Sequence, residues 1–239
     1  HQFDQIQVRG VSNFNAFNYN IPGDISSCSF FLVLTLLAND SNLVIKNVNI
    51  NSTRTGIIQI LNRMNAKIKF KNKRKYKGEL ISDIIVESKN NLRGVNCPKS
   101  LNSSAIDEFL VIFLLAAKAK GVSYFKNLSE LNQKESPRLK WASRILNKMG
   151  IKTITTDSSI RIYGNPNLKI NKQIIIKDYL KDHRVFMTSV IAALAFGGSW
   201  NIHNKESIKT SFPSFLNTIN DLTKFSQKSP KTYINTNKN

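Results

Sequence analysis

The pattern of apolar and polar positions along this chain predicts an order of helices and strands that is repeated. Asp24, Ser26 and Ser27 are residue types that favour helix starts, so they predict a long apolar helix from Asp24 to Ala38. The pattern then predicts a strand, a second helix capped by Ser52 and Thr53, and two further strands, at residues 43–46, 52–65, 67–71 and 81–87. A weak alternation before Gly23 predicts one more strand at residues 1–9.

The same order of elements comes back twice. In the second pass Asp107 precedes an apolar run, which is followed by a strand, a helix opened by residues 134–138 and a hairpin, at 109–117, 122–126, 134–150 and 152–163. In the third pass Asp182 precedes an apolar helix, which is followed by a strand and a last helix starting at Ser211, at 182–196, 200–203 and 211–225. The polar residues 226–239 are expected to form a mobile tail.

This order is an internal repeat. The helix-starting acids Asp24, Asp107 and Asp182 lie 83 and 75 residues apart, and each precedes an asparagine by 20 to 23 residues: Asn47, Asn127 and Asn204. The second helices also match, since Ile-Leu-Asn-Arg-Met at 60–64 returns as Ile-Leu-Asn-Lys-Met at 145–149 and more weakly as Phe-Leu-Asn-Thr-Ile at 215–219. We therefore expect three βαβαββ-like repeats that bury their apolar helices against one another beneath outer sheets.

A pseudo-threefold arrangement would gather the equivalent helix starts at one end of the fold. Asp24, Asp107 and Asp182 would then share a rim with Lys134 and Arg184. Helix N-termini and basic side chains both attract negative charge, so the rim is a candidate site for an anionic ligand.

The charge of the chain leaves two interpretations open. The formal net charge is +20, from 35 basic and 15 acidic residues among 239, and such a charge is typical of nucleic-acid-binding proteins. However, Lys, Asn and Ile are abundant throughout, and the densest basic run, Lys67 to Lys77, matches no nucleic-acid motif. A solvated hairpin would show the same run, and we favour that interpretation.

The two cysteines, Cys28 and Cys97, are too few for a disulfide scaffold and do not show the spacing of a metal site. No apolar run approaches the ~18 residues needed to span a bilayer. We expect a cytoplasmic protein with reduced thiols, no metal and no membrane contact.

Two charged clusters stand at predicted helix starts. Lys134, Glu135, Ser136, Pro137 and Arg138 crowd two cations and a carboxylate together, with Pro137 expected in the first helical turn, where its missing N–H costs nothing. The second cluster has the sequence Lys-Asp-His-Arg at 181–184.

Six motifs in one order identify a resemblance. They are Gly-Asp-Ile-Ser-Ser-Cys-Ser-Phe at 23–30, Asn-Ser-Thr-Arg-Thr-Gly at 51–56, Ile-Asp-Glu-Phe at 106–109, Lys-Glu-Ser with Arg138 at 134–138, Asp-His-Arg at 182–184 and Thr-Ser-Phe-Pro at 210–213. Each is weak alone, but together the chain resembles the carboxy-terminal domain of the 5-enolpyruvylshikimate-3-phosphate (EPSP) synthases. The resemblance implies an inside-out α/β barrel of repeated βαβαββ units.

The resemblance also implies a division of the chain. Residues 1–22 would end a preceding domain that is otherwise absent from this sequence, and residues 23–225 would form the carboxy-terminal domain, with repeats at about 23–88, 89–164 and 165–225. The family places its active site between two domains. We therefore expect the missing domain as a partner, a monomer once both are present, and no turnover by this chain alone.

The implied reaction transfers the enolpyruvyl group of phosphoenolpyruvate to the 5-hydroxyl of shikimate 3-phosphate without a cofactor. By resemblance, Asp107 contacts the 5-hydroxyl and accepts its proton, while Glu135 serves the methylene carbon as acid and then base. Lys134 would contact shikimate 3-phosphate. The implied phosphoenolpyruvate contacts are Arg138, Arg184 and, one residue out of register, Lys209.

Simpler interpretations stay open beside these roles. Asp24 and Asp107 could be helix caps only, Glu135 could pair with Lys134 on a solvated turn, and His183 could be a structural hydrogen-bonding group. Lys181 stands where the family frequently has glycine or a small polar residue, and Pro137 where it usually has an acid. The competing functions are a basic nucleic-acid-binding module on a related fold and a non-catalytic remnant.

Overall fold

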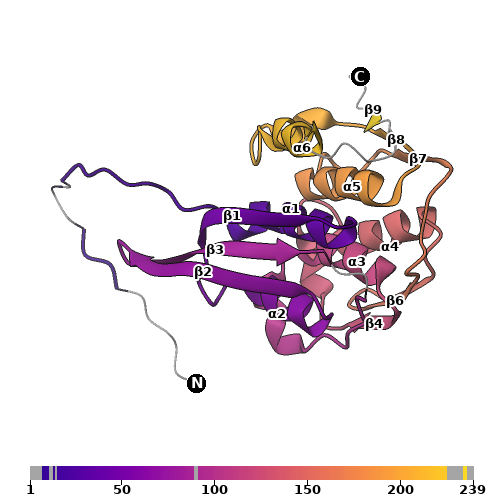
Figure 1. Cartoon of the computed structure of the whole chain (residues 1–239), viewed down its shortest axis with the longest axis horizontal. Coiled ribbons are helices and arrows are strands. Elements are labelled where there is room, and N and C mark those ends of the chain that lie inside the picture. The colour runs from indigo at the N-terminus through magenta and orange to yellow at the C-terminus, as the bar shows by residue number, and fades with distance from the viewer. Residues whose placement is uncertain (1–6, 11–12, 14, 89–90, 225–233, 236–239) are drawn as a thin grey trace.

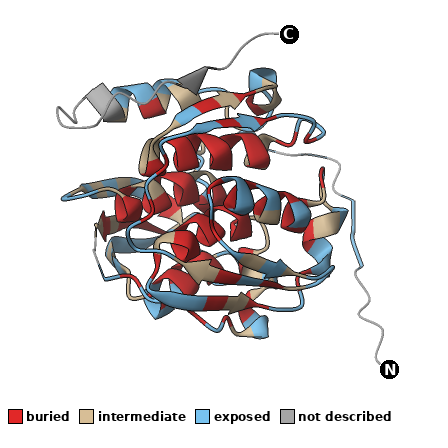
Figure 2. Ribbon diagram, turned by 90° about the vertical axis from the view of Figure 1, so that its right-hand side faces the viewer, coloured by how far each residue is buried: buried red, intermediate tan, exposed pale blue. Residues whose placement is uncertain are grey.

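Three apolar helices form the centre of the fold. The structure is a computed structural model that describes residues 7–10, 13, 15–88, 91–224 and 234–235. Helices α1 (Ile25–Leu37), α3 (Phe109–Lys118) and α5 (His183–Phe196) contact one another, and every residue from 109 to 117 is buried. A helix that is apolar on all sides must be covered on all sides. The predicted burial of the three repeat helices is therefore confirmed (Figures 1 and 2).

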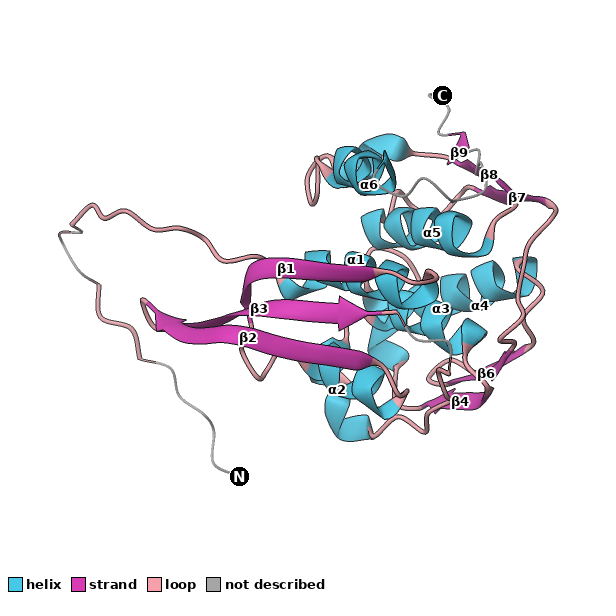
Figure 3. Ribbon diagram, in the orientation of Figure 1, coloured by secondary structure: helices cyan, strands magenta, loops and turns pink. Residues whose placement is uncertain are grey.

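Three small sheets lie outside these helices (Figure 3). In the first repeat the sheet order is β1-β3-β2, with both pairs antiparallel, and its strands are β1 (Asn42–Asn49), β2 (Lys67–Tyr76) and β3 (Glu79–Glu87). The second repeat has the same antiparallel order, β4-β6-β5, formed by β4 (Gly121–Phe125), β5 (Thr153–Thr155) and β6 (Ile160–Gly164). These sheets are the outer layer that the repeat predicts.

The outer helices α2 (Gly56–Arg63), α4 (Arg138–Lys148) and α6 (Phe215–Lys224) complete the repeats. In α4 the residues Leu139, Ala142 and Ile145 are buried, whereas Lys140 and Asn147 face solvent. One apolar face at helical spacing packs a helix onto a core and leaves its other face in water.

The third repeat departs from the other two. Its sheet contains β7 (Gln173–Ile176), which the sequence analysis did not predict, together with β8 (Ser199–Ile202) and β9 (Ile234–Asn235). Both pairings are parallel, in the order β7-β8-β9. The parallel β7–β8 pair has counterparts in the first two repeats, where isolated parallel bridges join Gly23 to Val48 and Asn96 to Tyr124. Each repeat thus brings its entering chain alongside the strand that follows its buried helix.

The repeated asparagines share one backbone conformation. Asn47, Asn127 and Asn204 have φ values of 55°, 59° and 58°, in the left-handed region that asparagine adopts more readily than most residues. Asn47 lies at an irregularity of β1, between Ile45 and Val48, and the other two follow the ends of β4 and β8. The sequence repeat therefore marks a tight change of direction rather than ordinary strand positions.

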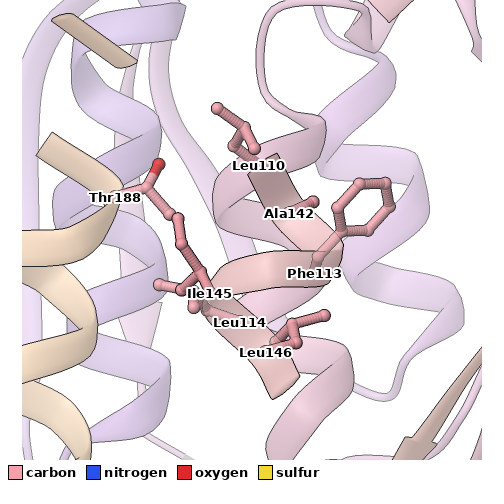
Figure 4. Close-up of a pocket in the computed structure, with 7 residues that line it drawn as sticks. All are labelled: Leu110, Phe113, Leu114, Ala142, Ile145, Leu146 and Thr188. Atoms are coloured by element: carbon pink, nitrogen blue, oxygen red, sulfur yellow. The ribbon is translucent and has the colours of Figure 1, made fainter. Parts of the chain in front are cut away.

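One gap in the core lies between α3, α4 and α5. Its lining is apolar except for Thr188, and the space is too small to admit water (Figure 4). The residues shown there are Leu110, Phe113, Leu114, Ala142, Ile145, Leu146 and Thr188. The Thr188 hydroxyl is buried without a hydrogen-bond partner, which costs stability because it has lost its water.

Several predicted boundaries were wrong. The described residues 7–9 do not form a strand, and residues 1–6 of that prediction lie outside the described part. Helix α2 begins at Gly56 after a turn rather than at Ser52–Thr53, and α6 begins at Phe215 rather than Ser211. Within the predicted tail, Ile234–Asn235 pairs with β8, and the rest of that tail lies outside the described residues. None of the described helices is long and apolar enough to cross a membrane.

Candidate active site

Three helix starts from two repeats meet around one arginine. Arg138 is the first residue of α4, Asp182 is the N-cap of α5, and Asp107 lies two residues before α3. Arg138 donates from Nε to Asp182 Oδ2 over 2.9 Å and from Nη1 to Asp107 Oδ1 over 3.3 Å. Asp107 and Arg138 are 31 positions apart in the chain, and Arg138 and Asp182 are 44 positions apart.

Asp182 is the fixed centre of this cluster. Its side chain is 0% exposed and accepts hydrogen bonds from Arg138, from Ser136 Oγ at 2.8 Å, and from the backbone N–H groups of Arg184 at 2.9 Å and Val185 at 3.4 Å. Burial by itself would raise the pKa of Asp182, but these hydrogen bonds and the charge of Arg138 together lower the pKa below its ordinary value. The carboxylate is therefore charged and satisfied on both oxygens.

Arg138 is itself buried, with 2% of its side chain exposed. Its Nη2 donates to Glu135 Oε2 and, over 3.4 Å, to Asp182 Oδ1. With Nε and Nη1 also engaged, three carboxylates surround one guanidinium. The family resemblance implies that Arg138 binds phosphoenolpyruvate, but here carboxylates of the chain itself accept hydrogen bonds from four of its five N–H groups.

Asp107 faces three cations. Its carboxylate lies 3.8 Å from Lys134 Nζ and 3.8 Å from Arg184 Nη2, in addition to its contact with Arg138. Arg184 Nη1 also donates to the Asp107 backbone carbonyl over 2.8 Å. The helix-cap interpretation of Asp107 was wrong, because Glu108 is the N-cap of α3 and neither residue forms a side-chain cap bond within the described residues. The Asp107 carboxylate is instead held in a basic environment beside solvent.

Glu135 is the exposed member of the cluster, with 52% of its side chain in solvent. Its partners are Arg138 and, at 4.0 Å, His183 Nδ1, so the alternative in which Glu135 only pairs with Lys134 does not hold. Lys134 pairs instead with Asp107 and, at 3.2 Å, with Glu130. Burial lowers the pKa of His183, and the charge of Arg184 adds to this, although Asp182 and Glu135 oppose it. The imidazole is therefore neutral at pH 7.

Pro137 lies one position earlier than expected. It is the N-cap of α4, with φ −70° and ψ 79°, and its carbonyl accepts the Trp141 N–H. Because the residue at this position needs no intrahelical N–H bond, proline is tolerated here as it is in the first turn.

Asp24 and Lys209 do not join this cluster. Asp24 caps α1 by accepting the Ser27 N–H at 2.8 Å, as predicted, and its carboxylate lies 3.8 Å from Arg54 Nη2. Lys209 is exposed in a turn. Its backbone N–H bonds to the Glu206 carbonyl, and within the described part of the chain no ion pair joins its side chain to Asp107, Glu135 or Asp182.

A second polar network, which the sequence analysis missed, connects α1 to α3. Ser26 Oγ donates to the buried Glu108 carboxyl and accepts from Arg54 Nη2 over 2.9 Å. Burial raises the pKa of Glu108, and Asp107 adds to this effect, while the Ser26 hydrogen bond and the charges of Arg184 and Arg54 oppose it. The position of Glu108 directly before a fully apolar helix could have indicated this network, because a buried acid needs a hydrogen-bond partner.

The chemical capacity of the cluster follows from its charges. Lys134 and Arg184 are partly exposed cations beside the half-exposed acid Glu135 and the carboxylate of Asp107. Such an arrangement can hold an anionic substrate and exchange protons with it. Among the described residues, no group of His, Cys, Asp and Glu side chains is arranged to hold a metal ion.

Comparisons with known proteins identify the relatives of this chain. The model of the EPSP synthase (3-phosphoshikimate 1-carboxyvinyltransferase) family matches residues 1–219. The 3-phosphoshikimate 1-carboxyvinyltransferase of Ruthia magnifica is 36% identical over 219 residues, which are 92% of this chain and 49% of that protein. The protein of the same name from Legionella pneumophila (strain Lens) is 40% identical over 205 residues, covering 85% and 46%. The chain spans about half the length of the curated relatives it matches.

Solved structures give the same result for the fold. EPSP synthase from Acinetobacter baumannii superposes with a TM-score of 0.78 at 34% identity, over 84% of this chain and 46% of that one. The enolpyruvyl transferase NikO from Streptomyces tendae, at 17% identity and a TM-score of 0.63, shares the fold alone. Since the family model covers nearly the whole chain and relatives reach 40% identity, the chain belongs to the EPSP synthase family.

Proposed function

We propose that this chain is the carboxy-terminal half of a 3-phosphoshikimate 1-carboxyvinyltransferase. The complete enzyme transfers the enolpyruvyl group of phosphoenolpyruvate to the 5-hydroxyl of shikimate 3-phosphate and releases phosphate. The observation that carries the proposal is the meeting of Asp107, Glu135 and three cations where α3, α4 and α5 begin. Residues 23–225 form one wall of the cleft, and the half that relatives possess in addition supplies the other. The enzyme works in the cytoplasm as a monomer and without a cofactor.

Two acids divide the proton transfers of this reaction. Asp107 accepts the 5-hydroxyl proton while that oxygen bonds to C2 of phosphoenolpyruvate, and Glu135 protonates the methylene carbon to give a tetrahedral intermediate. Glu135 then takes back a proton from the new methyl group as the bond from C2 to the phosphate oxygen breaks. The proton held by Asp107 passes to the departing phosphate, so the products are the enolpyruvyl ether and inorganic phosphate, and both acids return to their starting protonation states.

The cations neutralise the anionic groups of both substrates. Lys134, beside Asp107, contacts shikimate 3-phosphate, and the planar guanidinium groups of Arg138 and Arg184 suit the carboxylate and phosphate of phosphoenolpyruvate. Lys209 lies outside the cluster, and its role as an additional cation for phosphoenolpyruvate rests on the resemblance alone.

A chimera tests this function. The chain is joined to the amino-terminal half of the Ruthia magnifica relative, and phosphate release is measured with both substrates, for the chimera and for the chain alone. We expect turnover by the chimera and none above background by the chain, because one wall cannot enclose the substrates. A folded chimera that binds both substrates but releases no phosphate would support the remnant alternative, and robust release by the chain alone would refute the two-walled site.

The nucleic-acid alternative depends on the basic strand β2. Its cations are exposed, and β2 is an edge strand of its sheet, where lysines prevent pairing with other chains. The position of β2 at the sheet edge therefore explains its positive charge without a nucleic-acid partner. Any binding of DNA or RNA should therefore be nonspecific and fall by orders of magnitude between low and physiological salt, whereas sequence-selective binding at physiological salt would favour the alternative.

A further inference from the structure

The Arg138 guanidinium has no free face for a substrate. Only 2% of its side chain is exposed, and Asp182, Asp107 and Glu135 accept hydrogen bonds from four of its five N–H groups. An anion that binds there through two parallel hydrogen bonds must therefore replace one of these carboxylates.

The three carboxylates differ in how firmly they are held. Asp182 is fully buried, caps α5 and accepts from Ser136, so its departure would leave several buried donors without partners. Asp107 is tied on both its carboxylate and its carbonyl by Arg184. Glu135 is neither buried like Asp182 nor held by a second arginine like Asp107. Half of its side chain is in solvent, and its other partner, His183, lies 4.0 Å away.

The side chains on both sides of Glu135 have partners of their own. Ser136 Oγ is bonded to Asp182 over 2.8 Å, and Lys134 Nζ contacts Glu130 and Asp107. None of these contacts involves the Glu135 carboxylate, so a rotation of its side chain can vacate Arg138 while they are kept.

We propose that Glu135 is a displaceable counter-ion of Arg138, and that the phosphoenolpyruvate anion binds by exchanging with it. Asp182 keeps the guanidinium oriented throughout the exchange. The same event frees the Glu135 carboxylate from Arg138. Because half of this side chain is in solvent, it can then take up a proton from water and deliver that proton to the methylene carbon. This inference rests on the proposed function, since it assumes that Arg138 receives phosphoenolpyruvate.

Arginine labelling tests the exchange in the chain itself. Phenylglyoxal modifies accessible guanidinium groups, and peptide mass spectrometry gives the rate at Arg138. Glu135→Gln should raise this rate by roughly two- to fivefold, the range expected for losing an ion pair with one exposed partner, and Glu135→Ala should raise it at least as much. The matched control is Glu87→Gln, which removes the same charge from an ion pair with Lys67 on the first outer sheet and should leave the rate unchanged.

Phenylglyoxal protection by phosphoenolpyruvate supplies the second measurement. In the chimera, which has both walls of the proposed cleft, half-protection of Arg138 should need roughly two- to fivefold less phosphoenolpyruvate in Glu135→Gln than in the wild type, with circular dichroism confirming the fold. Equal labelling rates in wild type and both Glu135 variants, or no protection in any of them, would overturn the exchange. If labelling and protection behave as expected but the chimera releases no phosphate, the exchange stands and the proposed reaction fails.

Discussion

Replacing Asp182 by asparagine would remove one negative charge from the centre of the cluster while keeping the helix cap. Asparagine caps helices as well as aspartate does, and its one oxygen can still accept the Arg184 N–H. The Oδ2 position, however, now accepts from Arg138 Nε and Ser136 Oγ. An amide N–H placed there would face two donors, so both would lose their acceptor.

The structure sets the size of the effect. Breaking a buried ion pair costs about 3–5 kcal/mol because it strands the remaining charge. Arg138 keeps Asp107 and Glu135 as partners, so we expect the lower end, about 3 kcal/mol of unfolding free energy. For a domain of this size each kcal/mol corresponds to roughly 2–4 °C in Tm, which gives a fall of roughly 6–12 °C.

Asp24→Asn is the matched control, since it makes the same substitution at the equivalent helix start of the first repeat. Asp24 is 54% exposed and its Arg54 partner is 3.8 Å away, so its ion pair is worth about 0–1 kcal/mol. Urea and thermal unfolding of the two variants, followed by circular dichroism, give the comparison. Equal losses in both would show that Asp182 acts only as a cap and would refute the argument from burial.

The dependence on pH provides a second check. The pKa of Asp182 is lowered in the folded chain from its ordinary value of 3.8. Its charge therefore contributes stability that is fully present above pH 3.8 and is lost as pH falls towards the folded pKa. The stability difference between wild type and Asp182→Asn should be constant at neutral pH and narrow only in strong acid, and a gap that stays constant down to acid unfolding would contradict the ion-pair explanation.

Three further predictions concern other parts of the chain. Thr188→Val should raise the unfolding free energy by about 1 kcal/mol, because it removes a buried hydroxyl without a partner from an apolar gap; an unchanged or lower Tm would mean that the hydroxyl is satisfied. Lys181→Gly should stabilise the chain by roughly 0.5–1 kcal/mol in urea unfolding, because Lys181 has φ 56° and glycine adopts that region without strain; a loss of stability would contradict this. In the chimera, Asp107→Asn and Glu135→Gln should each lower turnover by about 10²–10⁴, whereas Asp24→Asn should stay near normal; comparable damage in all three would remove the catalytic assignment.

The local features of this fold could be predicted from the sequence. The three apolar runs became α1, α3 and α5, and Asp24 and Asp182 cap their helices. A cap bond joins residues two or three positions apart, and a helix without a polar face must be buried, so both outcomes depend on neighbouring residues. The repeat of Asn47, Asn127 and Asn204 was visible in the same way, but their left-handed backbone was not.

Most of the candidate site could also be predicted from the sequence motifs. Contacts in the fold join the predicted site residues Asp107, Lys134, Glu135, Arg138 and Arg184. Their prediction came from a family resemblance rather than from their spacing. The resemblance could not show that Arg138 is buried among three carboxylates. It also gave no role to Glu108, whose hydrogen bond to Ser26 connects residues 82 positions apart.

Tertiary structure decided what depended on distant partners. Asp107 looks like a helix cap in the sequence, yet Arg138 and Arg184 draw its carboxylate and carbonyl to the cluster. The strand β7 was not predicted, because its short apolar run forms a strand through parallel pairing with the distant strand β8. Local sequence determined where the helices form, because helix and cap energies come from residues a few positions apart. The protonation, burial and availability of each charged group are set by the few charges that the packed repeats place within 4 Å of it, and the linear order of residues does not contain those distances.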